Sequence, residues 1–351
     1  MSADAVEAEN MTGHDGSVDT GGFDAVTPWA DPQWRAEALA WVEEALARRD
    51  QKPASGAEGP RVRLRPWSVL VQVPVEGGTR VWFKANPAAS RFEPALAGAL
   101  HSWVPGQVLE PVAADTGRGW TLFPDGGEQV ALGGTSGDVK AWEDLLVQYA
   151  VLQRAVAAHR EELLSFGLPD LRPSGLAPVL GLLTHRTGGL DDAVHTSLSG
   201  LAPRFAQWCA ELEASGIPAT LDHADLQDGQ LFRADGGRFV FHDWDAASVA
   251  HPFASLVVVA RAVRRRFGDD ASAVLARLRD VYLEPWTDDG HSMAELRRLA
   301  DLATRVAPLG QAVRALAPGR MFPGTELDTR AVHSVGVQEG LAVACGLMLT
   351  P

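Results

Sequence analysis

The sequence predicts an α+β protein in which a small antiparallel sheet is followed by a larger, mostly helical part. Short apolar strands near Val62–Leu64, Val69–Val73 and Val81–Lys84 are separated by turn residues in the first third of the chain. Much of the remainder has apolar residues at three- and four-residue spacing, which indicates helices that pack through one face. The chain of 351 residues is long enough for two lobes with a large buried core.

The segments before the helical part differ in character. Residues 1–24 are acidic, lack periodicity and are expected to be disordered. Residues 25–59 are expected to hold a helix that begins at Asp31-Pro32 and a Pro- and Gly-rich linker. Residues 60–128 are expected to form the sheet, one helix and a connection to residues 129–351.

Residues 129–351 are expected to be mostly helical. A glycine-rich loop at 133–137 contains no lysine and no G-x-G spacing, so it is interpreted as a plain connection. The apolar periodicity predicts helices at 138–163, 201–214, 255–267, 271–282, 294–317 and 331–348.

Residues 223–243 place two acids and an amide at spacings suited to magnesium-dependent phosphoryl transfer. Asp225 is followed by Gln230, and the turn at Asp235-Gly236-Gly237 between apolar runs predicts a hairpin that brings Asp243 back beside Gln230. Phosphoryl transfer needs one carboxylate to accept the proton of the attacking hydroxyl and oxygen ligands for Mg²⁺. Asp225 is therefore the candidate base, with Gln230 and Asp243 as candidate metal ligands. The alternative is a polar surface hairpin with incidental acids.

This stretch resembles the aminoglycoside phosphotransferase/choline kinase-like family, whose usual signature is H-G-D-x-x-x-x-N followed by a strand that ends in D-W. The corresponding residues are His223, Ala224, Asp225, Gln230, Asp243 and Trp244. The resemblance implies a two-lobed protein-kinase-like fold, with a small antiparallel-sheet N-lobe and a larger, mostly helical C-lobe. Ala224 is expected to be harmless, whereas Gln230 replaces the usual asparagine with a longer side chain. His251 stands where the family has an acidic residue.

The resemblance also implies a lysine on the sheet and an acid on the next helix, which together position the nucleotide phosphates. Lys84 ends an apolar strand, and Glu93 lies in the first turn of the following helix, so this pair is the candidate nucleotide-binding set. The loop 65–68, which would cover the phosphates, contains no glycine, and Ser68 is its candidate contact. Residues 119–127 resemble the strand and hinge that join the lobes.

The sequence thus predicts a phosphotransferase that moves the γ-phosphoryl group of ATP or GTP, with Mg²⁺, to a hydroxyl of an aminoglycoside, amino sugar, sugar or amino alcohol. The alternative is a nucleotide-binding pseudoenzyme, which the substitution at Gln230 and the glycine-free loop motivate. A protein kinase is disfavoured, because the short segment between Trp244 and Phe253 has no room for an activation loop.

Composition narrows the classes of partner. The net charge of −14 argues against a nucleic-acid-binding surface and is compatible with a cationic acceptor. No basic-then-apolar leader and no apolar run of membrane-spanning length occurs in the sequence, so a cytoplasmic protein with no membrane partner is expected.

Overall fold

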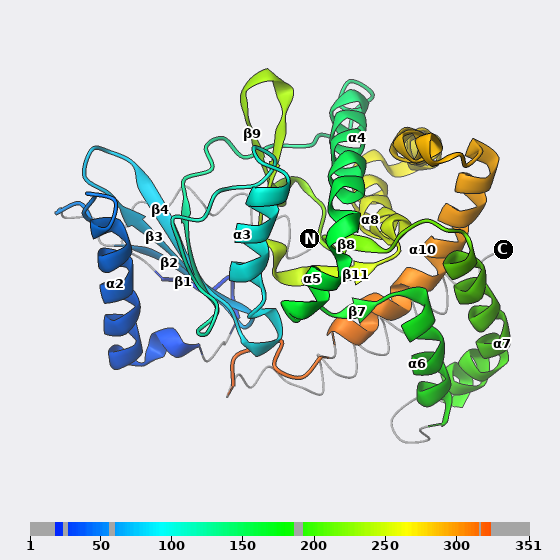
Figure 1. Cartoon of the computed structure of the whole chain (residues 1–351), viewed down its shortest axis with the longest axis horizontal. Coiled ribbons are helices and arrows are strands. Elements are labelled where there is room, and N and C mark those ends of the chain that lie inside the picture. Colours follow the sequence, from blue (N-terminus) through cyan, green and yellow to red (C-terminus); the bar gives the residue numbers. More distant parts are fainter. Residues whose placement is uncertain (1–17, 24–26, 56–59, 186–191, 316, 324–351) are drawn as a thin grey trace. The chain divides into compact units, whose positions relative to one another are not determined.

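The computed structural model describes residues 18–23, 27–55, 60–185, 192–315 and 317–323 (Figure 1). The chain divides into two compact units. The first comprises Met1–Glu128, Val240–Asp245 and Ala317–Thr329, and the second comprises the rest. The first unit thus contains two segments that lie later in the sequence than residue 128.

The first unit is built on a six-stranded sheet with the order β1-β2-β3-β4-β6-β5. Its strands are β1 (Val18–Asp19), β2 (Arg61–Arg65), β3 (Ser68–Pro74), β4 (Arg80–Ala85), β5 (Ala113–Asp115) and β6 (Trp120–Pro124). β1 is parallel to β2, and the other pairs are antiparallel. The antiparallel sheet predicted from the alternating apolar residues is confirmed.

The two faces of this sheet differ because successive side chains along a strand point to opposite sides. One face carries the buried apolar side chains of the strands and packs against α2 (Pro32–Ala47), which contributes Trp41, Val42 and Leu46 to the same core. The N-cap of α2 is Asp31, whose carboxylate accepts a hydrogen bond from Gln33 N–H, as the Asp31-Pro32 start predicts. The other face carries Lys84 and lies on the side of α3 (Glu93–Trp103) (Figure 1).

Segments from both ends of the chain hold the β2–β3 hairpin. Val18–Asp19 form β1, so the expectation of disorder over 1–24 is wrong for this part, and residues 1–17 lie outside the described residues. Asp19 forms an ion pair of 3.0 Å with Arg65, and the ring of Phe23 lies 5.1 Å from that of Trp67. Phe322 N–H donates to the carbonyl of Pro66 at 2.9 Å. The glycine-free loop at 65–68 is therefore anchored by partners far away in the sequence.

The second unit is mostly helical. Its helices are α4 (Val139–Val156), α5 (Arg160–Ser165), α6 (Pro173–His185), α7 (Asp192–Ala214), α8 (Leu256–Phe267), α9 (Ala271–Leu283) and α10 (Met293–Ala315). A small sheet of β7 (Asp170–Leu171), β11 (Ser248–Ala250) and β8 (Thr220–Asp222) also belongs to this unit. The remaining strands, β9 (Leu231–Arg233) and β10 (Phe239–Phe241), form a two-stranded hairpin, and the last two residues of β10 are assigned to the first unit.

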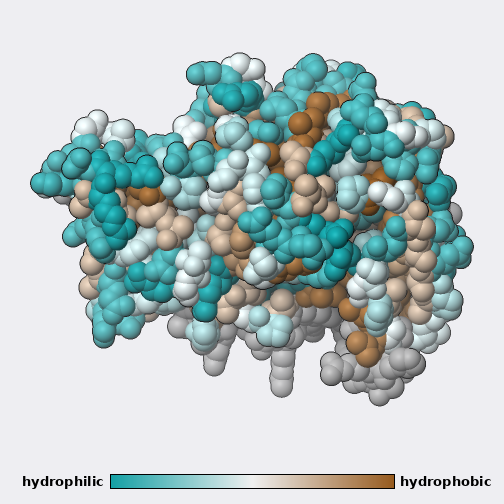
Figure 2. Space-filling view, viewed as in Figure 1, coloured by the Kyte–Doolittle hydropathy of each residue, from teal (hydrophilic) through white to brown (hydrophobic). Residues whose placement is uncertain are grey.

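The predicted helices agree with these elements within a few residues at most ends, and the predicted hairpin after Gln230 is present as β9 and β10. The helix predicted near 331–348 lies outside the described residues. In the part of the chain that the structure covers, no helix is long and apolar enough to cross a membrane. The face shown in Figure 2 is covered mainly by hydrophilic side chains, with apolar side chains in scattered patches.

Candidate active site

Lys84, at the end of β4, is surrounded by three carboxylates within the first unit. Its Nζ lies 2.8 Å from Glu93 Oε2, in direct contact with Asp243 Oδ1, and 3.5 Å from Asp245 Oδ2. The Lys84 side chain is 7% exposed and that of Glu93 is fully buried. The structure thus brings together Lys84, Glu93 and Asp243, three of the six residues predicted for the site.

Glu93 is the structural centre of this group. Besides Lys84, its carboxylate accepts hydrogen bonds from Asn86 Nδ2 at 2.6 Å and from the backbone N–H of Trp244 at 2.8 Å. The last contact fixes the chain directly after Asp243, and Asp243 itself has a left-handed φ of 63°, a conformation that costs a non-glycine residue energy. Glu93 therefore holds both Lys84 and the backbone that carries Asp243.

The charges in this group are unequal, with one cation and three potential anions. Burial alone would lower the pKa of Lys84, but the carboxylates of Asp243, Asp245 and Glu93 raise it well above its ordinary value. Burial raises the pKa of Glu93, the positive charge of Lys84 opposes this shift, and the two aspartates add to it. Lys84 is thus held firmly in its charged form, as a phosphate-binding lysine must be.

The sheet face around Lys84 offers a surface for a flat ring. Trp82 lies two residues before Lys84 on the same face and pairs across the sheet with Phe123, and Leu70 lies directly opposite Lys84. All three apolar side chains are partly exposed. Ser68, the fourth predicted residue in this unit, lies on the same face at the start of β3, about 7–8 Å from Lys84 between Cα atoms by its diagonal register.

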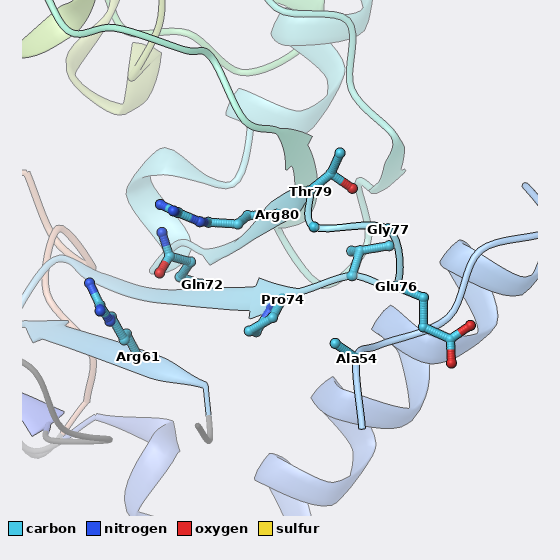
Figure 3. A pocket seen from close by; sticks show the side chains of 10 residues that line it. Ala54, Arg61, Gln72, Pro74, Glu76, Gly77, Thr79 and Arg80 are labelled. Atoms are coloured by element: carbon cyan, nitrogen blue, oxygen red, sulfur yellow. The ribbon is translucent and has the colours of Figure 1, made fainter. Parts of the chain in front are cut away.

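A shallow pocket of about 260 Å³ lies at the opposite end of β4 (Figure 3). The side chains of Arg61, Gln72 and Arg80 extend from neighbouring strands beside it (Figure 3). Arg80 precedes Lys84 by four residues, roughly 13 Å along a strand, too far for both to bind one phosphate group. Gly77 and Gly78 at its rim have φ of 92° and 85° and close the β3–β4 hairpin, as the sequence predicts.

Asp225 and Gln230 lie together in the second unit, on the loop between β8 and β9. Asp225 Oδ2 accepts from Gln230 Nε2 at 2.8 Å, and its Oδ1 accepts from Gln227 Nε2 at 3.0 Å. The next acid, Asp228, binds Arg266 of α8 at 2.5 Å. Two neutral amides therefore orient the Asp225 carboxylate without adding a positive charge. Gln230 contacts the proposed base through its amide nitrogen, a role that differs from the metal ligation expected of it.

The start of this loop is held by a buried acid that the sequence did not identify. Asp222 Oδ1 accepts from Ser255 Oγ at 2.6 Å and from the N–H of Ala224 at 3.2 Å, and Tyr149 Oη accepts from the N–H of His223 at 2.8 Å. Burial raises the pKa of Asp222, and the hydrogen bond from Ser255 partly offsets this shift. Asp222, immediately before the motif, is thus a buried acid that holds the start of this loop.

Two residues that depart from the family pattern have clear structural consequences. Ala224 has a φ of 60°, a left-handed conformation that costs a residue with a Cβ about 1 kcal/mol. His251 is 4% exposed, and its Nδ1 accepts from the N–H of Phe253 at 3.3 Å. Burial lowers the pKa of His251 to about 3, so it remains a neutral capping residue.

The described residues contain no group of three or more His, Cys, Asp or Glu side chains arranged to hold a metal ion by themselves. Magnesium on a nucleotide does not need such a group, because phosphates and water supply most of its ligands. The first unit offers Asp243, whose side chain is 34% exposed, and Asp245, which is 15% exposed. These carboxylate oxygens are of the type that Mg²⁺ prefers, so the donor set fits the ion.

Several of these contacts have no local signal in the sequence. Asn86 and Gln227 reach Glu93 and Asp225 through their amide groups, and the only hint is their closeness in sequence to Lys84 and Asp225. Asp245, two residues after Asp243, also lies beside Lys84.

The fold is similar to that of solved small-molecule kinases. A macrolide 2'-phosphotransferase from Brachybacterium faecium gives a TM-score of 0.51 at 15% identity, over 90% of this chain and 99% of that chain. An ethanolamine kinase from Plasmodium vivax gives 0.54 at 9% identity, over 81% and 79%. An aminoglycoside 2'-phosphotransferase in complex with GDP gives 0.51 at 14% identity, over 89% and 98%.

The chain has the protein-kinase-like fold of these small-molecule kinases. This agreement confirms the fold class predicted from the sequence, with its antiparallel sheet and its mostly helical second part. The sequence itself matches no protein-family profile and no curated protein. At such low identities the similarity establishes the fold, and the activity has to be argued from the residues.

Proposed function

We propose that the protein is a phosphotransferase that moves the γ-phosphoryl group of ATP or GTP to a hydroxyl group of a small molecule. The observation that carries this proposal is the buried group of Lys84, Glu93 and Asp243 in the first unit. A buried lysine held charged by carboxylates, on a sheet face with partly exposed apolar side chains, suits a nucleotide with its base and its phosphates. The GDP complex of the aminoglycoside 2'-phosphotransferase supports a nucleotide as donor.

In the proposed reaction the hydroxyl oxygen of the acceptor attacks the γ-phosphorus, and the bond from that phosphorus to the β–γ bridging oxygen breaks. The nucleoside diphosphate leaves, and the hydroxyl proton passes to Asp225. Gln227 and Gln230 orient the two Asp225 oxygens, so the base keeps its position while the acceptor binds. Lys84 contacts the phosphates, Glu93 holds Lys84, and Ser68 is the proposed contact from the loop at 65–68.

Asp243 and Asp245 are the proposed magnesium ligands in the first unit, and Gln230 keeps its amide oxygen as the third proposed ligand. When bound, the ion neutralises negative charge on the phosphates. On the nucleotide side, Trp82 with Phe123 and Leu70 forms the proposed surface for the base. The acceptors to be tested first are those predicted from the sequence: aminoglycosides, amino sugars, sugars and amino alcohols.

The experiment is a transfer assay with purified protein, ATP or GTP, and a panel of these acceptors together with anionic alcohols. Asp225→Asn is expected to abolish transfer while nucleotide binding persists, because the amide cannot accept the proton. Asp235→Asn, in the exposed turn before β10, is the matched control and is expected to retain activity. Full activity of Asp225→Asn would refute the assignment of the base.

A nucleotide-binding pseudoenzyme is the second candidate, and one observation favours it. Both Asp225 oxygens accept hydrogen bonds from glutamine side chains, and one of these glutamines occupies the position of the predicted metal ligand. This candidate predicts a nucleotide-induced rise in melting temperature without transfer to any acceptor. Gln230→Asn separates the two, since a large gain in activity would show an enzyme whose metal site is limited by the longer side chain.

A further inference from the structure

A cavity of about 510 Å³ lies among helices α8, α9 and α10 of the second unit. It is larger than the pocket of about 260 Å³ beside β4. No residue of the proposed catalytic set lines it. The buried side chains of Leu256, Val257 and Leu278 form its apolar part, and Ser272 and Thr304 add hydroxyl groups. A volume of this size suits a small molecule, since ligand pockets typically enclose a few hundred Å³.

The charged residues of this cavity are predominantly basic. Arg261, Arg264, Arg279 and Arg305 line it, and Asp301 is the only acid among its lining residues. Asp301 lies 3.5 Å from Arg279, so it offsets one of the four positive charges. A surplus of arginines is notable in a chain with 45 acidic and 31 basic residues.

Among the described residues, Arg261 and Arg264 have no carboxylate at hydrogen-bonding distance of their side chains. Arg261 donates to the neutral amide of Gln311 on α10. The side chain of Arg264 makes no hydrogen bond or ion pair with any described residue. Guanidinium groups bind carboxylates and phosphates through parallel hydrogen bonds, so an arginine of this kind at a cavity is a ready donor to an anionic group.

Arg261 also connects the cavity with the proposed base. Partial desolvation and the charge of Arg265 lower the pKa of the Arg261 guanidinium, whereas the carboxylate of Asp225 acts on it in the opposite direction. Asp228, three residues after Asp225, binds Arg266 of α8 at 2.5 Å, so the loop of Asp225 contacts the helix that carries Arg261 and Arg264. An acceptor in the cavity would have its hydroxyl end on this side.

We propose that this cavity is the acceptor site and that it takes an anionic alcohol, a small molecule with a hydroxyl group and a phosphate or carboxylate group. The inference rests on the proposed phosphotransferase function and specifies its acceptor. The arginines attract such a molecule, and the same charges disfavour the cationic aminoglycosides and amino alcohols that the resemblance implies. Arg264 is the specificity-determining contact with the anionic group.

The test compares four probes that share a hydroxyl group and differ in charge: glycerol 3-phosphate, glycerate, glycerol and choline. Binding to the full chain is measured calorimetrically with a saturating non-hydrolysable ATP analogue, which prevents the phosphate probe from occupying the nucleotide site. Glycerol 3-phosphate and glycerate are expected to bind at millimolar concentration, more weakly at high salt, and glycerol and choline are not. The anion that binds with higher affinity shows whether the site prefers a phosphate or a carboxylate group.

Variants of Arg264 decide whether the binding occurs in this cavity. Arg264→Gln is expected to weaken anion binding roughly tenfold or more, because a charge-assisted hydrogen bond is lost, and Arg264→Glu is expected to weaken it further. Both variants should fold, since Arg264 is exposed and its side chain has no hydrogen-bond or ion-pair partner among the residues that the structure describes. Arg298→Gln on α10, whose arginine is exposed and pairs with Glu211, is the matched control and should bind as the unmodified chain does.

Failure of this inference and failure of the proposed function give different results. Absence of anion binding, equal or stronger binding of choline, or unchanged affinity in Arg264→Glu overturns the assignment of the cavity. Phosphoryl transfer to a cationic acceptor that is unaffected by Arg264→Glu also overturns it and leaves the phosphotransferase function intact. Anion binding that depends on Arg264, without transfer to any acceptor, supports an anion-binding cavity and refutes the catalytic proposal.

Discussion

Replacement of Lys84 by methionine is expected to destabilise the protein more than replacement of its partner Glu93 by glutamine. Lys84 is the one cation among Glu93, Asp243 and Asp245, so the group carries a formal charge of −2 when all four are ionised. Without the lysine, three carboxylates face one another with no positive charge between them. Removing one partner of a buried pair costs about 3–5 kcal/mol.

The glutamine variant has the opposite electrostatic effect. Glu93→Gln removes one negative charge from a group that has an excess of them, and Lys84 keeps Asp243 and Asp245 as partners. Its main loss is one hydrogen bond, because an amide cannot accept from Asn86, Trp244 and Lys84 as a carboxylate does. That loss costs about 1–3 kcal/mol for a buried group left unpaired.

Urea unfolding followed by tryptophan fluorescence measures both free energies, with and without MgCl₂. Magnesium is expected to restore part of the stability of Lys84→Met, since a divalent cation neutralises the remaining carboxylates. Lys140→Met, which removes an exposed lysine paired with Asp144, is the control and should change little. Equal stability of Lys84→Met and Lys140→Met, or a larger loss in Glu93→Gln than in Lys84→Met, would refute this account of the charges.

Three further predictions concern separate features. Because His251 stays neutral in the folded protein down to about pH 3 while the unfolded chain protonates it near its ordinary pKa of 6.5, the free energy of unfolding should decrease as pH falls through this window. His251 contributes at most about 1.4 kcal/mol per pH unit to this dependence. His251→Asn keeps a capping acceptor but does not titrate in this window, so it should reduce the pH dependence of the free energy of unfolding. Urea unfolding at a series of pH values measures this change. Ala224→Gly should raise the free energy of unfolding by about 1 kcal/mol, and an unchanged or lower melting temperature would contradict the strain assigned to this position. Trp82→Ala should weaken nucleotide binding roughly tenfold or more in a fluorescence titration if the base stacks on this ring, whereas equal affinity would place the base elsewhere.

Local patterns predicted much of the fold because they report which side of an element is buried. The apolar run Val81–Phe83 predicted β4, whereas the pairing of Lys84 with Glu93 was expected from the family resemblance and not from a local pattern. Contacts between segments that are distant in the sequence could not be predicted from local patterns. Nothing in the sequence around Asp19 indicates that it joins β2, and nothing near Ser255 indicates that its hydroxyl binds Asp222.

The proposed acceptor illustrates how a global property can differ from a local one. The net charge of −14 is compatible with a cationic acceptor, but it sums over a surface on which charges lie far apart and are screened from one another by salt. A bound molecule interacts with the few charges within hydrogen-bonding distance, and in the cavity of α8, α9 and α10 these are mainly arginines. In the first unit the same chain surrounds a single lysine with three carboxylates, which suits a nucleotide that arrives with its magnesium ion. The local sign of the charge in each unit, and not its sum over the chain, therefore determines which molecule each can bind.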